Sequence, residues 1–280
     1  MSAITRRDIL AHQEVVPWAA QHQVEQDLLL CKSMEALFND SALRGQIAMR
    51  GGTLLHKVHL APASRYSEDI DLVAVGDGAE EDIKRAIRDV LADVLGGPAA
   101  SVWGDLRLAL RNAVRPSRVL RMTYRLPSLI EPGRRLEIVV EANMTERRPH
   151  RPVADLPFTY PFREGAASTR IRGFEIHEML GTKMRALFQR RRGRDLFDLY
   201  WALTRSAVPV EPAGIIESFR FYMEQEGSQA RRRDFVGILD GHLADPGFCS
   251  DMESLLRTGI SYEPRAAGDL IRSELLGLLP

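Results

Sequence analysis

Two aspartates separated by a single residue place the strongest constraint on what this chain can fold into. Asp69 and Asp71 alternate with Ile70 and Leu72, which predicts a strand with carboxylates on one face and apolar side chains on the other. The two carboxylate-bearing Cα atoms would lie about 7 Å apart. Like charges this close are unfavourable without a cation between them. Mg²⁺ suits such a pair, because proteins usually hold it with one or two carboxylates and substrate phosphates.

A glycine pair precedes this segment and follows another short strand-like run at residues 47–49. Gly51 and Gly52 would let backbone N–H groups approach a phosphate closely. A helix beginning at Thr53 would direct its N-terminal end toward the same anion. Ser67 lies just upstream of the aspartate strand, where its hydroxyl can bond phosphate or hold that strand. The combination predicts a metal-dependent phosphate site.

The remaining pattern predicts an α+β front and an all-helical back, with a boundary near residue 206. Further strands are expected over residues 119–126 and 136–142. Helical periodicity covers residues 23–38, 81–95, 176–189, 195–203, 212–223, 229–243 and 266–279. Residues 149–163 carry four prolines and are expected to form an irregular connection.

Composition places the chain among globular proteins and leaves its partners open. With 280 residues, 45% hydrophobic and 27% charged, it is neither mostly disordered nor fibrous. Lys plus Arg equals Asp plus Glu at 38 each, so only local clusters can argue for nucleic acid. One basic cluster is a predicted nucleic-acid contact, and it consists of Arg190, Arg191, Arg192 and Arg194.

The N-terminal residues and the lengths of the apolar runs indicate where in the cell the protein is expected. The N-terminal residues lack the apolar run of a signal peptide, and no stretch of 18 apolar residues suggests a membrane span. We therefore expect a cytoplasmic protein with no membrane contact. No heptad pattern indicates an oligomer, so a monomer is expected.

The order of these motifs resembles a known family. Gly-Gly-Thr at 51–53 followed by Ser-Glu-Asp-Ile-Asp-Leu at 67–72 resembles nucleotidyltransferases of the polymerase-beta superfamily. Within it, residues 50–57, residues 65–72, and Lys183 with residues 194–200 resemble the AbiEii/AbiGii toxins, which include the mycobacterial MenT toxins. The resemblance implies a nucleotidyltransferase-fold mixed sheet with flanking helices. It also implies a nucleotidyltransferase core with N-terminal helices over residues 1–205 and a helical C-terminal domain over 206–280.

The resemblance assigns roles near the aspartates. Asp69 and Asp71 match the paired metal carboxylates, and Lys57 matches a lysine that would neutralise triphosphate charge. The superfamily has a third carboxylate on a later strand, which helps to activate the acceptor hydroxyl. Glu141 is favoured for this role because it stands in a carboxylate-x-Asn pattern, and Glu137 remains the alternative.

The last motif of the family assigns roles to a later helical region. Lys183 matches a residue that could bind the β- and γ-phosphates, and Asp195 could orient a catalytic group or pair with an arginine. Asp198 lies on the same helical face as Asp195, three residues later.

The resemblance implies a Mg²⁺-dependent toxin of a toxin–antitoxin system that transfers nucleotides from an NTP to an acceptor. The acceptor would be the 3′ end of tRNA, the effect would be blocked translation, and the partner would be a cognate antitoxin protein. Two alternatives stay open. The acceptor hydroxyl could belong to a protein or a small molecule, or the chain could be a non-catalytic nucleotide- or RNA-binding module.

Overall fold

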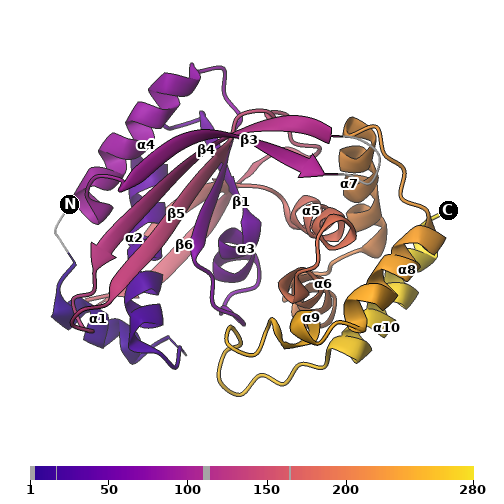
Figure 1. The fold of residues 1–280 in the computed structure, drawn as a ribbon. Helices are drawn as coiled ribbons and strands as arrows, with labels where there is room; N and C mark the ends of the chain where they lie inside the picture. Colours follow the sequence, from indigo (N-terminus) through magenta and orange to yellow (C-terminus); the bar gives the residue numbers. More distant parts are fainter. Residues whose placement is uncertain (1–3, 17, 110–113, 164) are drawn as a thin grey trace. The chain divides into compact units, whose positions relative to one another are not determined.

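The chain divides into two compact units, each described here by itself (Figure 1). The computed structural model describes residues 4–16, 18–109, 114–163 and 165–280, with the side chains of residues 103–117 left out. The first unit contains residues 1–106, 117–149 and 153–174, and the second contains residues 107–116, 150–152 and 175–280.

A seven-stranded mixed sheet, in the order β3-β4-β5-β2-β1-β7-β6, organises the first unit (Figure 1). β2 is parallel to β5 and β1 is parallel to β7, while β1–β2, β4–β5 and β6–β7 pair antiparallel. The strands are β1 (Ile47–Arg50), β2 (Asp69–Ala74), β3 (Ala100–Ala109), β4 (Val114–Pro127), β5 (Arg135–Asn143), β6 (Ala154–Phe162) and β7 (Gly165–Gly173).

One face of this sheet is covered and the other carries the acidic side chains. Ile70 and Leu72 of β2 are buried together with Val140 and Ala142 of β5. Helix α2 (Gln21–Asn39) packs against β2, β5 and β7, and α4 (Glu80–Leu95) packs against α2. Because successive strand residues point to opposite faces, Asp69 and Asp71 lie on the other face. The period-two pattern therefore gave the correct orientation of β2.

Short helical segments complete the first unit. Helix α1 (Arg6–Gln13) packs against α2 and β6. Helix α3 (Gly51–Leu54) follows β1 directly and continues as the π-helix η1 (Leu55–His59). The helix expected from Thr53 thus begins two residues earlier, at Gly51, because the Thr53 side chain bonds to the start of β2 instead of capping a helix.

The second unit is built mainly of helices. α5 packs against α7 and α6, α6 against α10, and α8 against α9 and α10. The elements are α5 (Ile176–Gln189), α6 (Gly193–Arg205), α7 (Pro212–Gln225), α8 (Arg232–Leu243), α9 (Pro246–Ser250), α10 (Pro264–Glu274) and the 3₁₀ helix η2 (Leu276–Leu278). The predicted helices are confirmed with small shifts at their ends, whereas α9 was not predicted. In the described part of the chain, no strand follows residue 206.

The expected irregular connection over residues 149–163 was wrong, because most of it is strand β6. β6 is an edge strand that pairs with β7 alone. Pro157 and Pro161 fit there because an edge strand needs only half of its backbone N–H groups for a partner strand. Strands β3 and β7 were also not predicted, since neither has a clear apolar alternation.

The division between the units also differs from the sequence expectation. We expected a boundary near residue 206, whereas the compact units separate after Phe174. The reason is packing: α5 contacts α7 so closely that Gly181 lies against Ser218 and Phe219. Helices α5 and α6 therefore share a core with the C-terminal helices.

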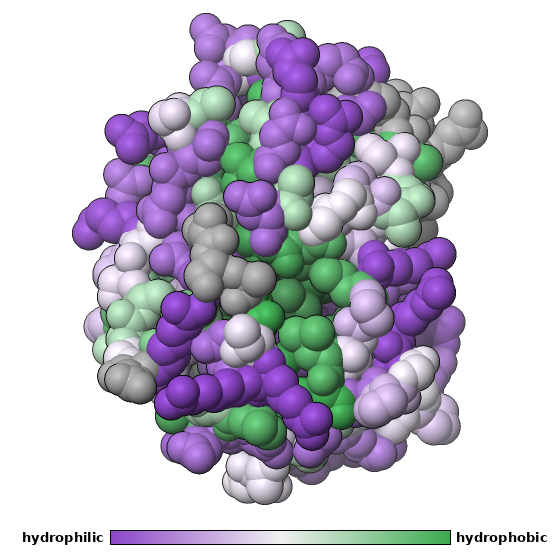
Figure 2. Space-filling view, turned by 90° about the vertical axis from the view of Figure 1, so that its left-hand side faces the viewer, coloured by the Kyte–Doolittle hydropathy of each residue, from purple (hydrophilic) through white to green (hydrophobic). Residues whose placement is uncertain are grey.

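Polar side chains dominate the face in Figure 2, which views the molecule from the side where Figure 1 shows α4. Apolar side chains gather in a band near the middle of that face (Figure 2). Among the described helices, none combines the length and apolar character needed to cross a membrane.

Two helical glycines test the packing of the second unit. A Cβ at Gly181 would lie 2.6 Å from the Ser218 Cβ and 2.8 Å from the backbone nitrogen of Phe219, so Gly181→Ala should destabilise the unit by about 1–3 kcal/mol through overpacking. Gly237 of α8 is exposed and has no atom within 4 Å of such a Cβ, so Gly237→Ala should stabilise it by about 0.5–1 kcal/mol. Urea denaturation of both variants measures this. Equal effects of the two substitutions would contradict the α5–α7 packing.

Candidate active site

Three carboxylates lie on the face of the central strands that is opposite to the face covered by α2. In the parallel pairing of β2 with β5, Asp71 is opposite Glu141, and Asp69 is opposite Val139. Residues opposite each other in a sheet point to the same face. Asp69, Asp71 and Glu141 therefore share one face, and each is only partly buried.

The register separates the two candidates for the third carboxylate. Glu137 also faces this side, but it lies two residues before Val139, beyond the partner of Asp69. Its side chain is 51% exposed and pairs with Arg125, at 2.9 Å between Nε and Oε2. Glu141 is 26% exposed and directly opposite Asp71. The geometry brings Glu141, and not Glu137, next to the aspartate pair.

The surroundings of Glu141 raise the pKa of its carboxyl group. Burial raises its pKa, and the negative charge of Asp71 raises it further. Arg121 and Arg50 lower it but do not cancel the rise. The Nη1 atom of Arg121 lies 2.7 Å from Oε1 of Glu141. Two carboxylates from neighbouring strands thus lie side by side on this face, and a bound cation would lower the repulsion between them.

The glycine turn lies against this acidic face. Gly51 has a φ of +83°, a backbone conformation that residues other than glycine rarely adopt. A Cβ at this position would lie 1.8 Å from Oδ2 of Asp71. A Cβ at Gly52 would lie 2.5 Å from Nη2 of Arg65, whose side chain is buried. The turn therefore passes between the Asp71 carboxylate and the Arg65 guanidinium. A side chain at either Gly51 or Gly52 would clash with one of these groups.

Thr53 and Ser67 connect the turn to the aspartate strand. The Thr53 hydroxyl donates a hydrogen bond to the backbone carbonyl of Asp69 and shares one of 2.6 Å with the Ser67 hydroxyl. Thr53 is buried. This bonding fixes the start of β2 relative to the glycine turn, so Thr53 and Ser67 hold the aspartates in place.

Lys57 has a partner that sequence reasoning missed. Its ammonium forms an ion pair with Asp27 of α2, and both side chains are almost fully buried, at 8% and 3% exposed. Asp27 also accepts hydrogen bonds from Trp18 Nε1 and His12 Nε2, each at 2.9 Å. Burial would raise the pKa of Asp27, but Lys57 and His12 hold it well below its usual range. In this structure Lys57 anchors η1 to α2, and its triphosphate contact stays a prediction.

The later motif lies in the second unit. The Lys183 ammonium lies 2.8 Å from Asp198 Oδ2 and 3.3 Å from Asp195 Oδ1, and both carboxylates are fully buried. Arg190 binds Asp195 with two contacts, at 2.8 and 3.0 Å. Lys183 of α5 and Arg190, which caps α5, therefore pair with Asp195 and Asp198 of α6. The phosphate role of Lys183 and the catalytic role of Asp195 stay predictions.

The predicted nucleic-acid cluster is partly engaged in ion pairs within this unit. Arg190 binds Asp195, and Arg191 binds Asp245. Arg191 and Arg192 are exposed, and the backbone N–H of Arg194 donates to Asp251 at 3.1 Å. The cluster presents guanidinium groups to solvent, but acidic neighbours reduce its net positive charge.

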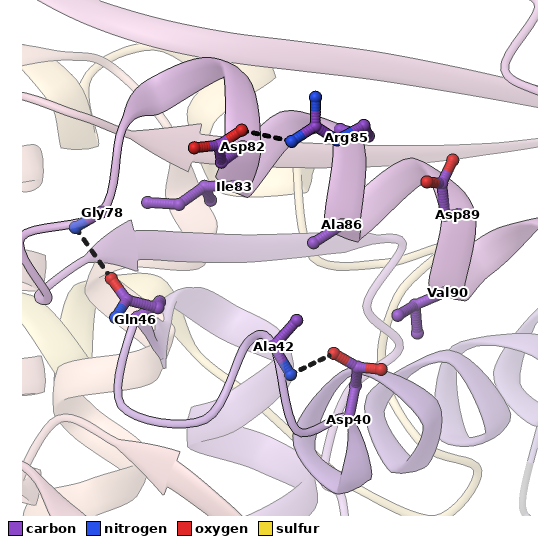
Figure 3. Close-up of a pocket in the computed structure, with 10 residues that line it drawn as sticks. All are labelled: Asp40, Ala42, Gln46, Gly78, Asp82, Ile83, Arg85, Ala86, Asp89 and Val90. Atoms are coloured by element: carbon purple, nitrogen blue, oxygen red, sulfur yellow. Dashed lines mark hydrogen bonds and ion pairs between the residues drawn. The ribbon is translucent and has the colours of Figure 1, made fainter.

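A pocket of about 480 Å³ lies elsewhere in the first unit, between α4 and the segment after α2 (Figure 3). Its visible contacts are an ion pair of Asp82 with Arg85 and backbone N–H groups bonded to Gln46 and Asp40 (Figure 3). It contains none of the predicted site residues. We therefore assign the candidate site to the open sheet face.

The donor set of the open face fits Mg²⁺, which prefers oxygen ligands and tolerates an incomplete protein cage. The described residues contain no group of three or more His, Cys, Asp or Glu side chains gathered closely enough to hold a metal alone. Asp71 with Glu141 supplies a pair of carboxylates, to which substrate phosphates would add the remaining ligands.

Three residues at the site were not identified from the sequence: Asp27, Arg65 and Arg121. Asp27 stands among apolar residues on a helix face, and an acid in that place was a usable sign of a buried ion pair. Arg121 occupies an alternate position of a predicted strand. Its partner follows only from the β4–β5 register, which the sequence does not reveal.

Comparison with known families shows that the chain is a nucleotidyltransferase. The family model of the nucleotidyl transferase AbiEii toxin, type IV toxin–antitoxin system, matches residues 32–267. The chain therefore belongs to the AbiEii family of nucleotidyltransferase toxins of type IV toxin–antitoxin systems, which confirms the resemblance read from its motifs. Membership implies a nucleotide substrate and an antitoxin partner.

Solved structures share the fold at low sequence identity. MenT4, a nucleotidyltransferase toxin from Mycobacterium tuberculosis, is 18% identical with a TM-score of 0.56, covering 98% of this chain and 88% of that one. JHP933 from Helicobacter pylori is 17% identical with a TM-score of 0.50, covering 91% of this chain and 94% of that one. No curated protein matches the sequence significantly. The expected nucleotidyltransferase fold is confirmed.

The Asp27–Lys57 pair makes a testable distinction between anchoring and phosphate binding. Lys57→Met should lower the free energy of unfolding by about 3–5 kcal/mol, because it leaves the buried Asp27 carboxylate without its cation. The double variant Lys57→Met with Asp27→Asn should recover part of this loss. Thermal and urea denaturation measure both. A Lys57→Met protein of unchanged stability and weakened NTP binding would contradict the anchoring role.

Proposed function

We propose that this toxin transfers a nucleotidyl group from an NTP to an acceptor hydroxyl with the help of Mg²⁺, and that the acceptor is the 3′ end of tRNA. The observation that carries the proposal is the register of Asp71 opposite Glu141, beside the glycine turn. Asp69, Asp71 and Glu141 would hold the metal, which would supply charge neutralisation for the triphosphate and the reacting oxygens.

The donor nucleotide is proposed to bind on the β1 side of the carboxylates. The turn at Gly51 and Gly52 brings backbone close to Asp71, and the Arg65 guanidinium places positive charge against the same turn. Ser67 lies within reach of this turn through its bond to Thr53. Backbone N–H groups and one buried cation make a suitable environment for a triphosphate tail.

Glu141 is proposed to activate the acceptor. The acceptor oxygen forms a bond to the α-phosphorus while the bond from that phosphorus to the β-phosphate oxygen breaks, and pyrophosphate leaves. The acceptor proton passes to the Glu141 carboxylate. Glu141 lies directly opposite Asp71 on the proposed metal site, so its carboxylate is placed to accept a proton from a hydroxyl that binds there.

Support for a tRNA acceptor comes from the family resemblance and from the exposed arginines of the second unit. Arg191 and Arg192 are exposed and could contact a phosphate backbone. A phosphate-binding role for Lys183 and a catalytic role for Asp195 remain part of the proposal on the family resemblance alone. Growth arrest through blocked translation, and its reversal by the antitoxin partner, would follow from blocked tRNA ends.

The experiment that tests the proposal is a label-transfer assay. The purified chain, Mg²⁺ and each NTP radiolabelled at the α-phosphate are incubated with total tRNA. Label should appear on tRNA with one or more NTPs. Glu141→Gln should lower the rate about 100-fold or more, because it removes the proton acceptor. Glu137→Gln is the matched control on the same strand and face, and it should stay within about twofold of wild type.

Other results of this assay would contradict parts of the proposal. Label on protein would replace tRNA with a protein acceptor. An equal loss in Glu137→Gln and Glu141→Gln would contradict the assignment from the register. Absence of transfer to tRNA, protein and small-molecule acceptors by a folded chain would contradict the metal-dependent site.

A further inference from the structure

Arg121 forms an ion pair with Glu141. It lies on β4, and the β4–β5 register places it directly opposite Glu141 on the open face. Its Nη1 atom is 2.7 Å from Oε1 of Glu141, and the two side chains are 51% and 26% exposed. Glu141 therefore has Asp71 on one neighbouring strand and Arg121 on the other.

Asp71 and Glu141 lie between two arginine-bearing strands on this face. Asp71 is directly opposite Glu141, Arg50 of β1 is opposite Asp71, and Arg121 of β4 is opposite Glu141. Arg50 also pairs with Glu146, at 2.5 Å. Arg121 carries a single positive charge and bonds to Glu141, whereas a divalent cation between Asp71 and Glu141 would neutralise both carboxylates.

A purely structural role for the Arg121–Glu141 pair is the alternative explanation. Half-exposed ion pairs contribute little to folding, because water screens them and ordering long side chains costs entropy. The same two strands carry a comparable pair, Arg125 with Glu137, at 2.9 Å and with both side chains about half exposed. That pair has no Asp71 beside it, so it serves as an internal reference.

We propose that Arg121 is an exchangeable counter-ion: its guanidinium occupies Glu141 until a divalent cation binds Asp71 and Glu141, and cation binding displaces it. The inference rests on the metal site of the proposed function. The exchange involves no bond making or breaking in the chain. Because Arg121 is half-exposed, its displaced side chain enters solvent without requiring a cavity.

The test is the affinity of the full chain for Mg²⁺ alone, measured by isothermal titration and by the Mg²⁺ dependence of the melting temperature. Arg121→Gln should bind Mg²⁺ about two- to tenfold more tightly than wild type, because the ion no longer competes with a guanidinium. Arg121→Lys keeps a positive charge opposite Glu141 and should stay closer to wild type. Arg125→Gln, the matched control, should keep the wild-type affinity.

Three results would overturn the exchange. The first is an unchanged or weaker Mg²⁺ affinity in Arg121→Gln, which would mean that Arg121 does not compete. The second is an equal gain in Arg125→Gln, which would reduce the effect to general charge removal. The third is absence of Mg²⁺ binding by both wild type and Arg121→Gln. The label-transfer assay tests the proposed function separately. A failure of the Arg121 exchange can therefore be distinguished from a failure of the proposed nucleotidyl transfer.

Discussion

The repulsion between Asp71 and Glu141 is the constraint on which the rest of the site depends. The parallel β2–β5 register places the two carboxylates opposite each other on the sheet face that α2 does not cover. Such a pair opposes folding unless other groups offset its charge. Arg121 supplies part of that offset through its 2.7 Å contact with Glu141. We propose that a divalent cation offsets the remaining repulsion and that the phosphates of a nucleotide bind through this cation.

The surrounding structure holds this pair in place from two sides. Ile70 and Leu72, which alternate with the aspartates, are buried under α2 and fix which face β2 presents. Thr53 ties the start of β2 to the glycine turn, and the buried Asp27–Lys57 pair ties the π-helix after that turn to α2. Rigid support of this kind keeps binding groups oriented before the ligand arrives. An ion pair far from solvent thus contributes to the position of a solvent-facing turn.

Much of the site was predictable because its signals are local. The alternation around Asp69 and Asp71 sets the strand face, and the glycine pair sets the turn. The pattern around Glu141 favoured it over Glu137, and the register agrees with that preference. The unpredicted features depend on pairing across long sequence distances. The proline-containing β6 is stabilised by β7, and the Asp27–Lys57 contact depends on how α2 packs. The boundary between the units differs from the predicted one for the same reason, because α5 packs against α7.

The central claim is that Asp69, Asp71 and Glu141 form a metal and nucleotide site on the open face of the sheet. The most direct measurement is a crystal structure of the chain with Mg²⁺ and a non-hydrolysable NTP. The account predicts a metal bound to Asp71 and at least one more of these carboxylates, with the triphosphate against Gly51 and Gly52. A nucleotide bound elsewhere, such as the pocket between α4 and the segment after α2, with the carboxylate face unliganded, would contradict it.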